Sequence, residues 1–151
     1  VDLSGMEEHI ADAHKAHEGN FYSFPTPESL IDLGIAGLAA LKTGFRAKYI
    51  FDAAGRVCSG EIDPKLIEEM STADAVKYLC SVKGIGPKVA SCALLFGFAK
   101  LDAFPIDVWI KKVIAKYFDT EFEPESLGQY AGIAQQYLFY YMRENSRKGE
   151  K

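Results

Sequence analysis

The fold of this 151-residue chain is decided by two stretches, Cys80-Ser-Val-Lys-Gly-Ile-Gly-Pro-Lys-Val-Ala-Ser-Cys92 and, shortly after it, Phe104-Pro-Ile-Asp-Val-Trp109. Gly84 and Gly86 separate two apolar helical patterns, and a proline opens the second pattern. Glycine permits the crowded or left-handed backbone that so tight a reversal needs, and proline suits the first helical position because its missing N–H has no partner there. The first stretch therefore predicts two helices joined by a hairpin at residues 83–87.

The hairpin also predicts a place where chemistry can occur, because a hairpin followed by a helix N-terminus offers backbone amides to an anion. Lys88 lies in the first turn of the second helix, and Asp107 stands just before the next one. The helix expected at residues 87–99 is about 20 Å long. The loop at residues 100–106 reaches at most about 23–25 Å. It is therefore just long enough to return the chain to the end that carries Lys88.

Each of these residues has a functional and an ordinary interpretation. The helix dipole disfavours a charged ammonium at Lys88, partial burial would add to this effect, and nucleophilic attack requires the neutral amine. Most lysines are nevertheless solvated cations. Asp107 can remain ionised and stabilise positive charge, or it can serve only as a helix N-cap. Cys92 and Phe96 lie one and two turns after Lys88, where spacing alone favours ordinary core over a pocket wall.

The composition describes a single domain with a hydrophobic core. The chain is 48% apolar and has no run of about 18 apolar residues, so we expect no membrane span. Its first residues lack the basic-then-apolar pattern of a signal peptide. The three cysteines, Cys58, Cys80 and Cys92, form neither a disulfide framework nor a CxxC metal knuckle. We therefore expect a reducing, intracellular compartment.

The net charge of −4 argues at first against a nucleic-acid partner, but the charges are unevenly distributed. Residues 1–40 contain seven acids and one base, whereas residues 41–60 contain four bases and one acid. Residues 75–118 contain seven lysines and two acids. Positive charge thus gathers around the hairpin and on one earlier segment. Lysines that are merely solvated on helix faces would give the same pattern about as often.

Helical patterns cover the chain, and no stretch reads convincingly as a strand. Cap-like residues followed by proline open helices at Thr26-Pro27 and Asp63-Pro64, and Ser71 with Asp74 does so more weakly. We expect an all-α, compact multi-helix bundle of roughly eight helices, which include residues 4–19, 45–57, 72–82, 87–99, 107–118 and 127–145. The last of these has an apolar stripe that we expect to face the core, formed by Tyr130, Ile133, Ala134, Tyr137, Leu138, Tyr141 and Met142.

The motifs at residues 82–92 and 104–109 resemble the helix-hairpin-helix, Gly/Pro-rich and aspartate signature of the DNA glycosylase superfamily. Three further stretches are similar to its 8-oxoguanine DNA glycosylase branch: Phe21-Tyr-Ser-Phe-Pro25, Gly44-Phe-Arg-Ala-Lys-Tyr49 and Tyr130-Ala-Gly-Ile-Ala-Gln-Gln-Tyr-Leu-Phe139. Many DNA-binding modules contain such a hairpin. The motifs together and in this order make the resemblance specific.

The resemblance implies base-excision DNA repair by a bifunctional DNA glycosylase and AP lyase. Lys88 would attack the sugar C1′, release the damaged base as an imine forms, and lead to β-elimination of the strand. Asp107 would support the positive charge of the sugar and help to position Lys88. Such enzymes flip the target nucleotide out of the duplex, because the reacting atom cannot be reached inside the stack.

The resemblance also implies a pocket for the flipped base. The base would lie between Cys92 and Phe139, with Phe96 and Pro105 beside it, and Gln135 would read its Watson–Crick edge. Gln135 and Phe139 are one helical turn apart, so both can face one pocket. Without the motif, a surface amide and a core phenylalanine are the plainer interpretations.

Contacts to DNA are implied by the same resemblance. Phe45 would wedge into the gap left by the flipped nucleotide, and Arg46 would hydrogen-bond the widowed cytosine; either could otherwise be a routine helix-surface residue. Trp109 takes the place of a histidine that contacts a phosphate in eukaryotic relatives. The backbone amides of three hairpin residues, Gly84, Gly86 and Val89, would hold a backbone phosphate, and a structural cation on the hairpin carbonyls is left open.

The chain also departs from this family. The family's N-terminal β-rich domain has no counterpart, so we expect residues 1–151 to form the helical glycosylase domain alone, and the missing starting methionine favours a fragment. The four-cysteine cluster of iron–sulfur relatives is absent, and the lysine argues against the monofunctional alkylbase branch. We expect no metal and no required cofactor, and a monomer that acts on double-stranded DNA containing a damaged base. We place it in the cytoplasm and nucleoid, or in the nucleus of a eukaryote. The alternatives are a non-catalytic helix-hairpin-helix module and a glycosylase for another damaged base.

Overall fold

The structure is a computed structural model that describes residues 23–118 and 121–148. Its helices are α2 (Pro27–Leu38), α3 (Ala47–Cys58), α4 (Pro64–Glu69), α5 (Thr72–Cys80), α6 (Pro87–Gly97), α7 (Val108–Tyr117) and α8 (Ala131–Lys148). Shorter turns are η1 (Ala39–Thr43), η2 (Gly44–Arg46) and η3 (Pro124–Tyr130). The described residues contain no strand, so the prediction of an all-α fold is confirmed. The helix expected at residues 4–19 lies outside the described residues.

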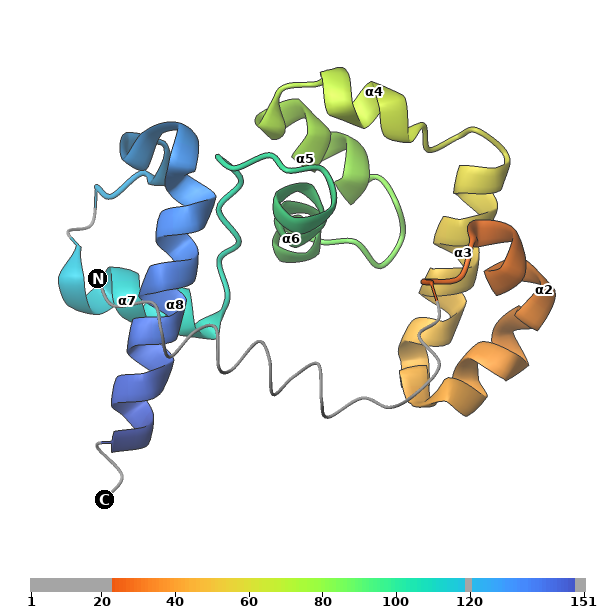
Figure 1. The fold of residues 1–151 in the computed structure, drawn as a ribbon, viewed down its shortest axis with the longest axis horizontal. Coiled ribbons are helices and arrows are strands. Elements are labelled where there is room, and N and C mark those ends of the chain that lie inside the picture. The colour runs from red at the N-terminus through yellow and green to blue at the C-terminus, as the bar shows by residue number, and fades with distance from the viewer. Residues whose placement is uncertain (1–22, 119–120, 149–151) are drawn as a thin grey trace.

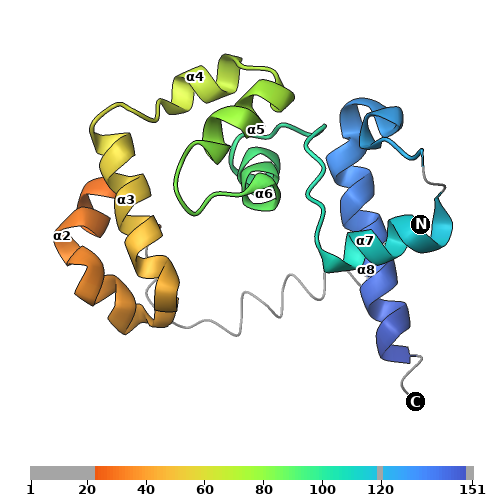
Figure 2. The same ribbon diagram turned by 180° about the vertical axis from the view of Figure 1, so that it is seen from behind.

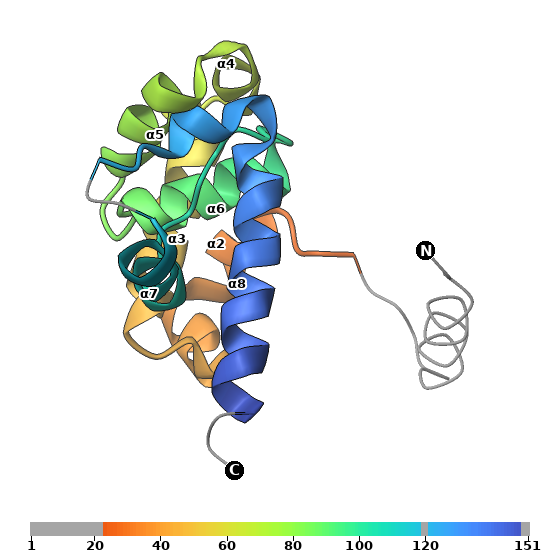
Figure 3. The ribbon, with the colours of Figure 1, turned by 90° about the vertical axis from the view of Figure 1, so that its left-hand side faces the viewer.

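The helices form three groups along the molecule (Figures 1 and 2). The α2–α3 pair occupies one end, α4 to α6 the middle, and α7, η3 and α8 the other end. The loop between α5 and α6, which contains the hairpin, is directed toward α3. Figure 3 shows α8 running along one side of the other helices. The hairpin therefore lies in the middle of the chain and of the molecule.

The helix starts are explained by local chemistry. Thr26, Asp63 and Ser71 are the N-caps of α2, α4 and α5, and the side chain of each accepts a hydrogen bond from a backbone amide of the first turn. Proline opens α2 and α4, as predicted. The helix ends are less accurate, because α5 and α6 each end two residues before the expected position. Ala99, just after α6, has a φ of +52°, which no helix can continue.

Two apolar clusters hold the groups together. The larger one joins α4, α5 and α6 around buried side chains that include Ile67, Ala75 and Leu94. The smaller one joins Phe104 in the loop after α6 with Ile110 of α7 and Ala131 of α8. The loop at residues 98–107 thus connects two cores, and its course decides where Asp107 lies relative to the hairpin.

The apolar stripe expected to face the core along the last helix is wrong for its tyrosines and for Ile133, whereas Leu138 packs against the smaller cluster. Tyr137 is 75% exposed and Tyr141 54% exposed, and Tyr130 and Ile133 are exposed as well. The buried side of α8 instead contains Ala131, Gly132 and Gln135. Small residues bring this side against the loop before α7, so close packing, rather than the largest apolar side chains, decides which face is buried.

Candidate active site

The hairpin is built by backbone geometry. After α5 ends, Ile85 N donates to the Val82 carbonyl at 3.0 Å, which closes the turn. Gly84 has a φ of +92°, a conformation that a residue with a Cβ adopts only at a cost. A Cβ on Gly84 would also stand 2.5 Å from a ring carbon of Tyr49. Glycine is therefore required at this position by both conformation and space.

The start of α6 lacks the side-chain cap that α2, α4, α5 and α7 have. Gly86 is the N-cap and has no side chain to accept the amides of the first turn. The amides of Lys88 and Val89 have no acceptor inside the helix, because the first N–H groups of any helix lack one. Val89 is 49% exposed and Gly86 is exposed. The three hairpin residues predicted to hold a phosphate, Gly84, Gly86 and Val89, thus all lie at the surface.

Lys88 is exposed, so burial does not add to the effect of the helix dipole on its amine. It lines an open cavity of about 810 Å³ between α5, α6, the loop before α7 and η3. Phe104 and Ile106 of that loop line the same cavity, which places the returning chain beside the start of α6. The lysine reaches open space because it stands in the first turn, ahead of the buried part of α6 that begins at Ala90.

Other polar groups of this cavity were missed by sequence reasoning. Asp102 lines it and accepts a hydrogen bond from the Thr72 hydroxyl at 2.6 Å. Lys77 of α5 and Glu125 of η3 also contribute to the lining. The signal available in the sequence was the position of Asp102 inside the returning loop, but no motif marks it.

Asp107 is half-buried and is the N-cap of α7. Its carboxylate oxygen Oδ1 accepts from the amides of Trp109 at 2.9 Å and Ile110 at 2.8 Å. The helix-cap interpretation therefore describes what this residue does in the structure. The neighbouring Ile106 lines the cavity of Lys88, whereas Asp107 is not among the lining residues. The loop before α7 therefore lines the cavity of Lys88, but the Asp107 carboxylate does not.

Gln135 is 3% exposed, so the interpretation as a surface amide is wrong. Its Nε2 donates to the carbonyl of Pro105 at 2.9 Å, and its Oε1 accepts from Gln136. Pro105 is fully buried. Two of the residues predicted to form the base pocket, Gln135 and Pro105, are thus in direct contact, and the Gln135 amide is held by protein partners.

Gly132 is a structural residue to which the sequence assigned no role. Its amide donates to the Leu101 carbonyl at 2.7 Å. A Cβ there would stand 2.4 Å from the carbonyl oxygen of Ala103 and 2.6 Å from the Leu95 side chain. Lys100 adds a further tie, because its ammonium donates to the Met70 carbonyl at 2.6 Å. These bonds fix the loop that leads to Asp107.

The remaining predicted pocket residues are not brought into one enclosed slot. Cys92 is partly buried, and Phe139 packs against the cluster around Ile110. The core interpretation thus fits Phe139. Phe96 is 65% exposed, so ordinary core is wrong for this residue. None of these three lines the cavity that contains Lys88.

The residues predicted to contact DNA are accessible. Phe45 is 69% exposed, and the Arg46 guanidinium lies 4.6 Å from the centre of its ring. Both belong to η2, just before α3. Trp109 is half-buried in the first turn of α7, and the Lys112 ammonium lies 4.5 Å from its ring centre. Two accessible aromatic side chains with adjacent cations are compatible with binding to a polyanion.

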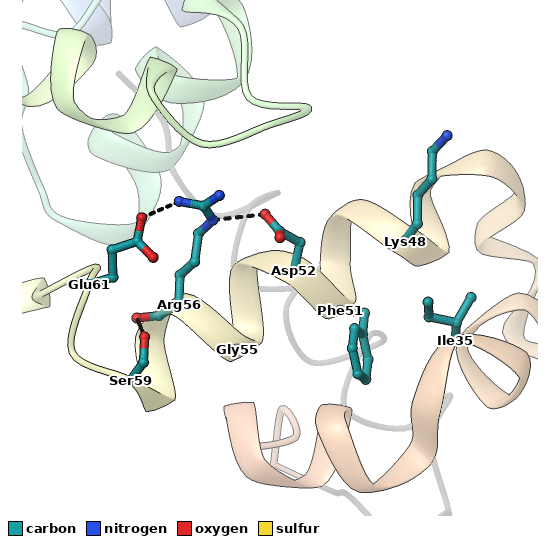
Figure 4. Close-up of a pocket in the computed structure, with 8 residues that line it drawn as sticks. All are labelled: Ile35, Lys48, Phe51, Asp52, Gly55, Arg56, Ser59 and Glu61. Atoms are coloured by element: carbon teal, nitrogen blue, oxygen red, sulfur yellow. Dashed lines mark hydrogen bonds and ion pairs between the residues drawn. The ribbon is translucent and has the colours of Figure 1, made fainter.

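A second hollow of about 460 Å³ lies beside α3, and Lys48, Arg56 and Ser59 are among its lining residues (Figure 4). Arg56 is held there between Asp52, at 2.9 Å, and Glu61. The hydrogen bond from Arg56 to Asp52 is the main reason why the pKa of Arg56 is raised. Because two carboxylates neutralise this cation, the hollow is an ion-pair region that ties α3 to the chain before α4.

Three further observations concern metal binding, acid–base behaviour and membrane insertion. Among residues 23–118 and 121–148, no three His, Cys, Asp or Glu side chains gather in a way that could hold a metal ion. On α7, the hydrogen bond from Lys116 lowers the pKa of the Tyr117 phenol, and the same bond raises the pKa of Lys116. No helix in the described part of the chain is long and apolar enough to cross a membrane.

The chain was compared with known proteins. No family model matches it. A probable N-glycosylase/DNA lyase of Methanothermobacter thermautotrophicus is 34% identical over 95% of this chain and 46% of its own length. The solved structure of MBOgg1 with a low-affinity DNA ligand is 42% identical, with a TM-score of 0.74 over 86% of this chain and 48% of that one. The Clostridium acetobutylicum 8-oxoguanine glycosylase/lyase, bound to DNA with cytosine opposite 8-oxoguanine, is 35% identical, with a TM-score of 0.75 over 86% and 48% of the two chains.

These similarities extend over almost the whole chain and agree with the hairpin geometry. Over most of its length the chain is similar to N-glycosylase/DNA lyases and to 8-oxoguanine glycosylase/lyases. This similarity confirms the recognition made from the motifs. The chain spans about half the length of these three relatives.

Proposed function

We propose that this protein acts in base-excision DNA repair as a bifunctional DNA glycosylase and AP lyase that removes oxidised guanine from duplex DNA. The observation that carries the proposal is the position of Lys88. It lies in the first turn of α6, a helix start without a side-chain cap, and lines an open cavity of about 810 Å³. If the hairpin amides bind a DNA phosphate, the sugar attached to that phosphate can approach the Lys88 amine. Relatives of both activities, similar over almost the whole chain, support the assignment.

The proposed reaction first removes the base and then cleaves the strand. The lone pair of the Lys88 amine forms a bond to C1′ while the glycosidic C1′–N bond breaks and its electron pair leaves with the base, which takes the proton that the Lys88 nitrogen gives up. Asp107 stabilises the positive charge that develops on the sugar. The sugar ring opens to an imine on Lys88, a proton leaves C2′, and the 3′-phosphate departs by β-elimination. Water then hydrolyses the imine and frees the lysine.

The proposed recognition uses the remaining predicted residues. Phe45 would fill the gap in the duplex, Arg46 would bond the widowed cytosine, and Gln135 would read the flipped base. The Gln135 amide is held by Pro105 and Gln136, so reading the base requires it to use its second amide hydrogen or to exchange a partner. Cys92, Phe139 and Phe96 would form the walls of the pocket. Trp109 would contribute a backbone contact beside Lys112.

The reaction as proposed uses only protein groups and needs no cofactor. A cation on the hairpin carbonyls and a monomeric state stay predictions. Because the substrate is DNA, we place the protein in the nucleoid-bearing cytoplasm, or in the nucleus of a eukaryote. Residues 1–151 would act as the helical glycosylase domain.

The competing function is a non-catalytic helix-hairpin-helix module that only grips duplex DNA. The exposure of Lys88 and the use of Asp107 as a helix cap favour it. A glycosylase for another damaged base is a variant of the first proposal. Its test is excision of alkylated purines against 8-oxoguanine.

Borohydride trapping separates catalysis from simple binding. The chain is incubated with two duplexes, one that contains an abasic site and one that contains 8-oxoguanine opposite cytosine, and imines are reduced to stable adducts. We expect an adduct with both duplexes for the wild type and none for Lys88→Gln. Lys83→Gln is the matched control, because Lys83 is an exposed hairpin lysine five residues earlier. Duplex binding without any adduct would contradict the enzymatic function, and an adduct on abasic DNA alone would restrict it to the lyase step.

A further inference from the structure

The segment that bears Phe45 and the hairpin that bears Gly84 are 39 residues apart in the sequence, yet one side chain joins them. That side chain is Tyr49, in the first turn of α3. Its ring lies directly over the Gly84 backbone, since a Cβ on Gly84 would stand 2.5 Å from the ring carbon Cγ and 2.8 Å from both Cδ carbons. The equal distances to the two Cδ carbons place this Cβ over the ring face at its Cγ end.

The Tyr49 ring also contacts Phe45. The two ring centres are 6.5 Å apart with an angle of 80° between the rings, which is an edge-to-face contact. Such pairs have a preferred geometry, so the position of one ring restrains the other. Phe45 itself is 69% exposed, and Arg46 lies over its free face. Because the Tyr49 ring contacts Gly84 and its centre lies 6.5 Å from the Phe45 ring centre, the Phe45 ring stands within about 10 Å of the hairpin backbone.

The register of α3 explains this arrangement. Tyr49, Ala53 and Val57 recur every four residues, so they share one face of the helix. Ala53 and Val57 pack against the core of α4, α5 and α6. Phe45 lies one further step of four residues along, beyond the end of this packed face. Tyr49 thus continues the face of α3 that packs on the core, and its ring contacts both Gly84 of the hairpin and the exposed Phe45 ring.

We propose that Tyr49 is a positioning residue that couples the phosphate grip of the hairpin to insertion of Phe45 into the duplex. This inference rests on the proposed function. When the hairpin amides hold a phosphate, the ring over Gly84 fixes where the Phe45 ring meets the base stack. The spacing of about 10 Å corresponds to about three base-pair steps of duplex DNA, so both contacts fall within one short site. The aromatic ring supplies the coupling, and the phenol hydroxyl is not required for it.

The proposal is tested with a fluorescent base analogue that replaces a base beside the target nucleotide and brightens when the stack is opened. The equilibrium brightening is measured for the wild type, Tyr49→Phe and Tyr49→Leu, alongside affinity for undamaged duplex. We expect Tyr49→Phe to match the wild type and Tyr49→Leu to reduce the stack-opening equilibrium about tenfold. Affinity for undamaged duplex is expected to change less, because the hairpin grip stays in place.

Two further variants separate coupling from loss of stability. Val57→Ala removes packing on the same face of α3 but does not lie between the hairpin and Phe45, so it is expected to lower the melting temperature without changing the fluorescence. In a Phe45→Ala background, Tyr49→Leu is expected to have little further effect on stack opening, since the ring through which it acts is gone.

The outcomes are distinguishable. An equal effect of Tyr49→Leu in both backgrounds, a full loss in Tyr49→Phe, or a matching loss in Val57→Ala would overturn the positioning role. A wild type that gives no fluorescence change on damaged DNA would contradict base flipping, and with it both the proposed function and this inference. A wild-type signal that Tyr49→Leu leaves intact would overturn only the inference.

Discussion

The starts of α6 and α7 carry the two residues predicted to perform chemistry, and they are built in opposite ways. At α7, the Asp107 carboxylate accepts two amides of the first turn. At α6, Gly86 leaves the corresponding amides without a side-chain acceptor. The difference is not imposed by packing, because a Cβ on Gly86 would meet nothing within 4 Å and its φ of −100° suits any residue. We call the start of α7 closed, because a protein side chain accepts its first amides. We call the start of α6 open, because its first amides are free to bind an external anion.

The contrast also shows how one local rule can serve two purposes. A helix N-terminus needs an acceptor for its first amides. The Asp107 carboxylate accepts the first amides of α7 and stabilises that helix. Gly86 has no side-chain acceptor, so water or a phosphate must accept the first amides of α6. Four changes test this comparison, from the largest expected effect to the smallest.

Asp107→Asn separates the charge of this residue from its capping. Asparagine caps a helix about as well as aspartate, so the free energy of unfolding should stay within about 0.5 kcal/mol of the wild type. If the Asp107 carboxylate stabilises positive charge on the sugar, as proposed, its loss should lower the single-turnover rate of base excision about 100-fold. Asp107→Ala should lose the rate and also about 0.5–2 kcal/mol of stability. Equal rates for wild type and Asp107→Asn would restrict Asp107 to capping.

Gly132→Ala disturbs the loop that leads to the start of α7 and leaves the start of α6 unchanged. The added methyl group would meet the Ala103 carbonyl at 2.4 Å, and backbone must move to admit it. We expect a loss of about 1–3 kcal/mol in the free energy of unfolding, measured with urea. Gly55→Ala in α3 is the control, because its Cβ meets nothing and alanine favours a helix. A neutral Gly132→Ala would contradict the role of Gly132 in fixing the loop.

Gly86→Asp converts the open start into a closed one. The new carboxylate can accept the first amides of α6 and also repels a phosphate that would bind there. We expect duplex affinity to fall about tenfold while the melting temperature stays equal or rises. Gly86→Ser, a neutral cap, should give an intermediate affinity. Unchanged binding by Gly86→Asp, measured by fluorescence anisotropy, would show that this helix start does not grip DNA.

The start of α5 provides the smallest effect and a pH test. Asp74 has a lowered pKa, first because Ser71 donates a hydrogen bond to it and second because of Lys77. A carboxyl group whose folded pKa is lowered stabilises the protein above its unfolded pKa, and this contribution disappears as the pH falls through the folded value. The gap in melting temperature between wild type and Asp74→Asn should therefore narrow from pH 6 to pH 3. A constant gap would contradict the assigned pKa shift.

Local features of this fold could be predicted from the sequence because they depend on neighbours along the chain. The caps Thr26, Asp63 and Ser71 and the hairpin after Cys80 are of this kind. Their residues satisfy backbone groups within two or three positions, so composition and spacing are enough. The order of the motifs was likewise enough to recognise the similarity to N-glycosylase/DNA lyases.

Features set by contacts between distant segments could not be predicted. Periodicity placed the tyrosines of α8 on the core side, but the close approach of Gly132 to residue 103 turned the opposite face inward. The burial of Gln135 against Pro105 and the ring of Tyr49 over Gly84 depend on partners about 30 residues or more away. A single sequence contains no local signal for such pairs.

The central claim is that the open start of α6 places Lys88 to form a covalent bond with a damaged nucleotide. The most direct test is to reduce the complex of the wild type with 8-oxoguanine duplex, digest it, and locate the modified residue by tandem mass spectrometry. The account predicts that the sugar remnant is attached to the Nζ atom of Lys88. A remnant on another lysine, such as Lys83 or Lys77, or its absence from every peptide of a DNA-bound sample, would contradict it.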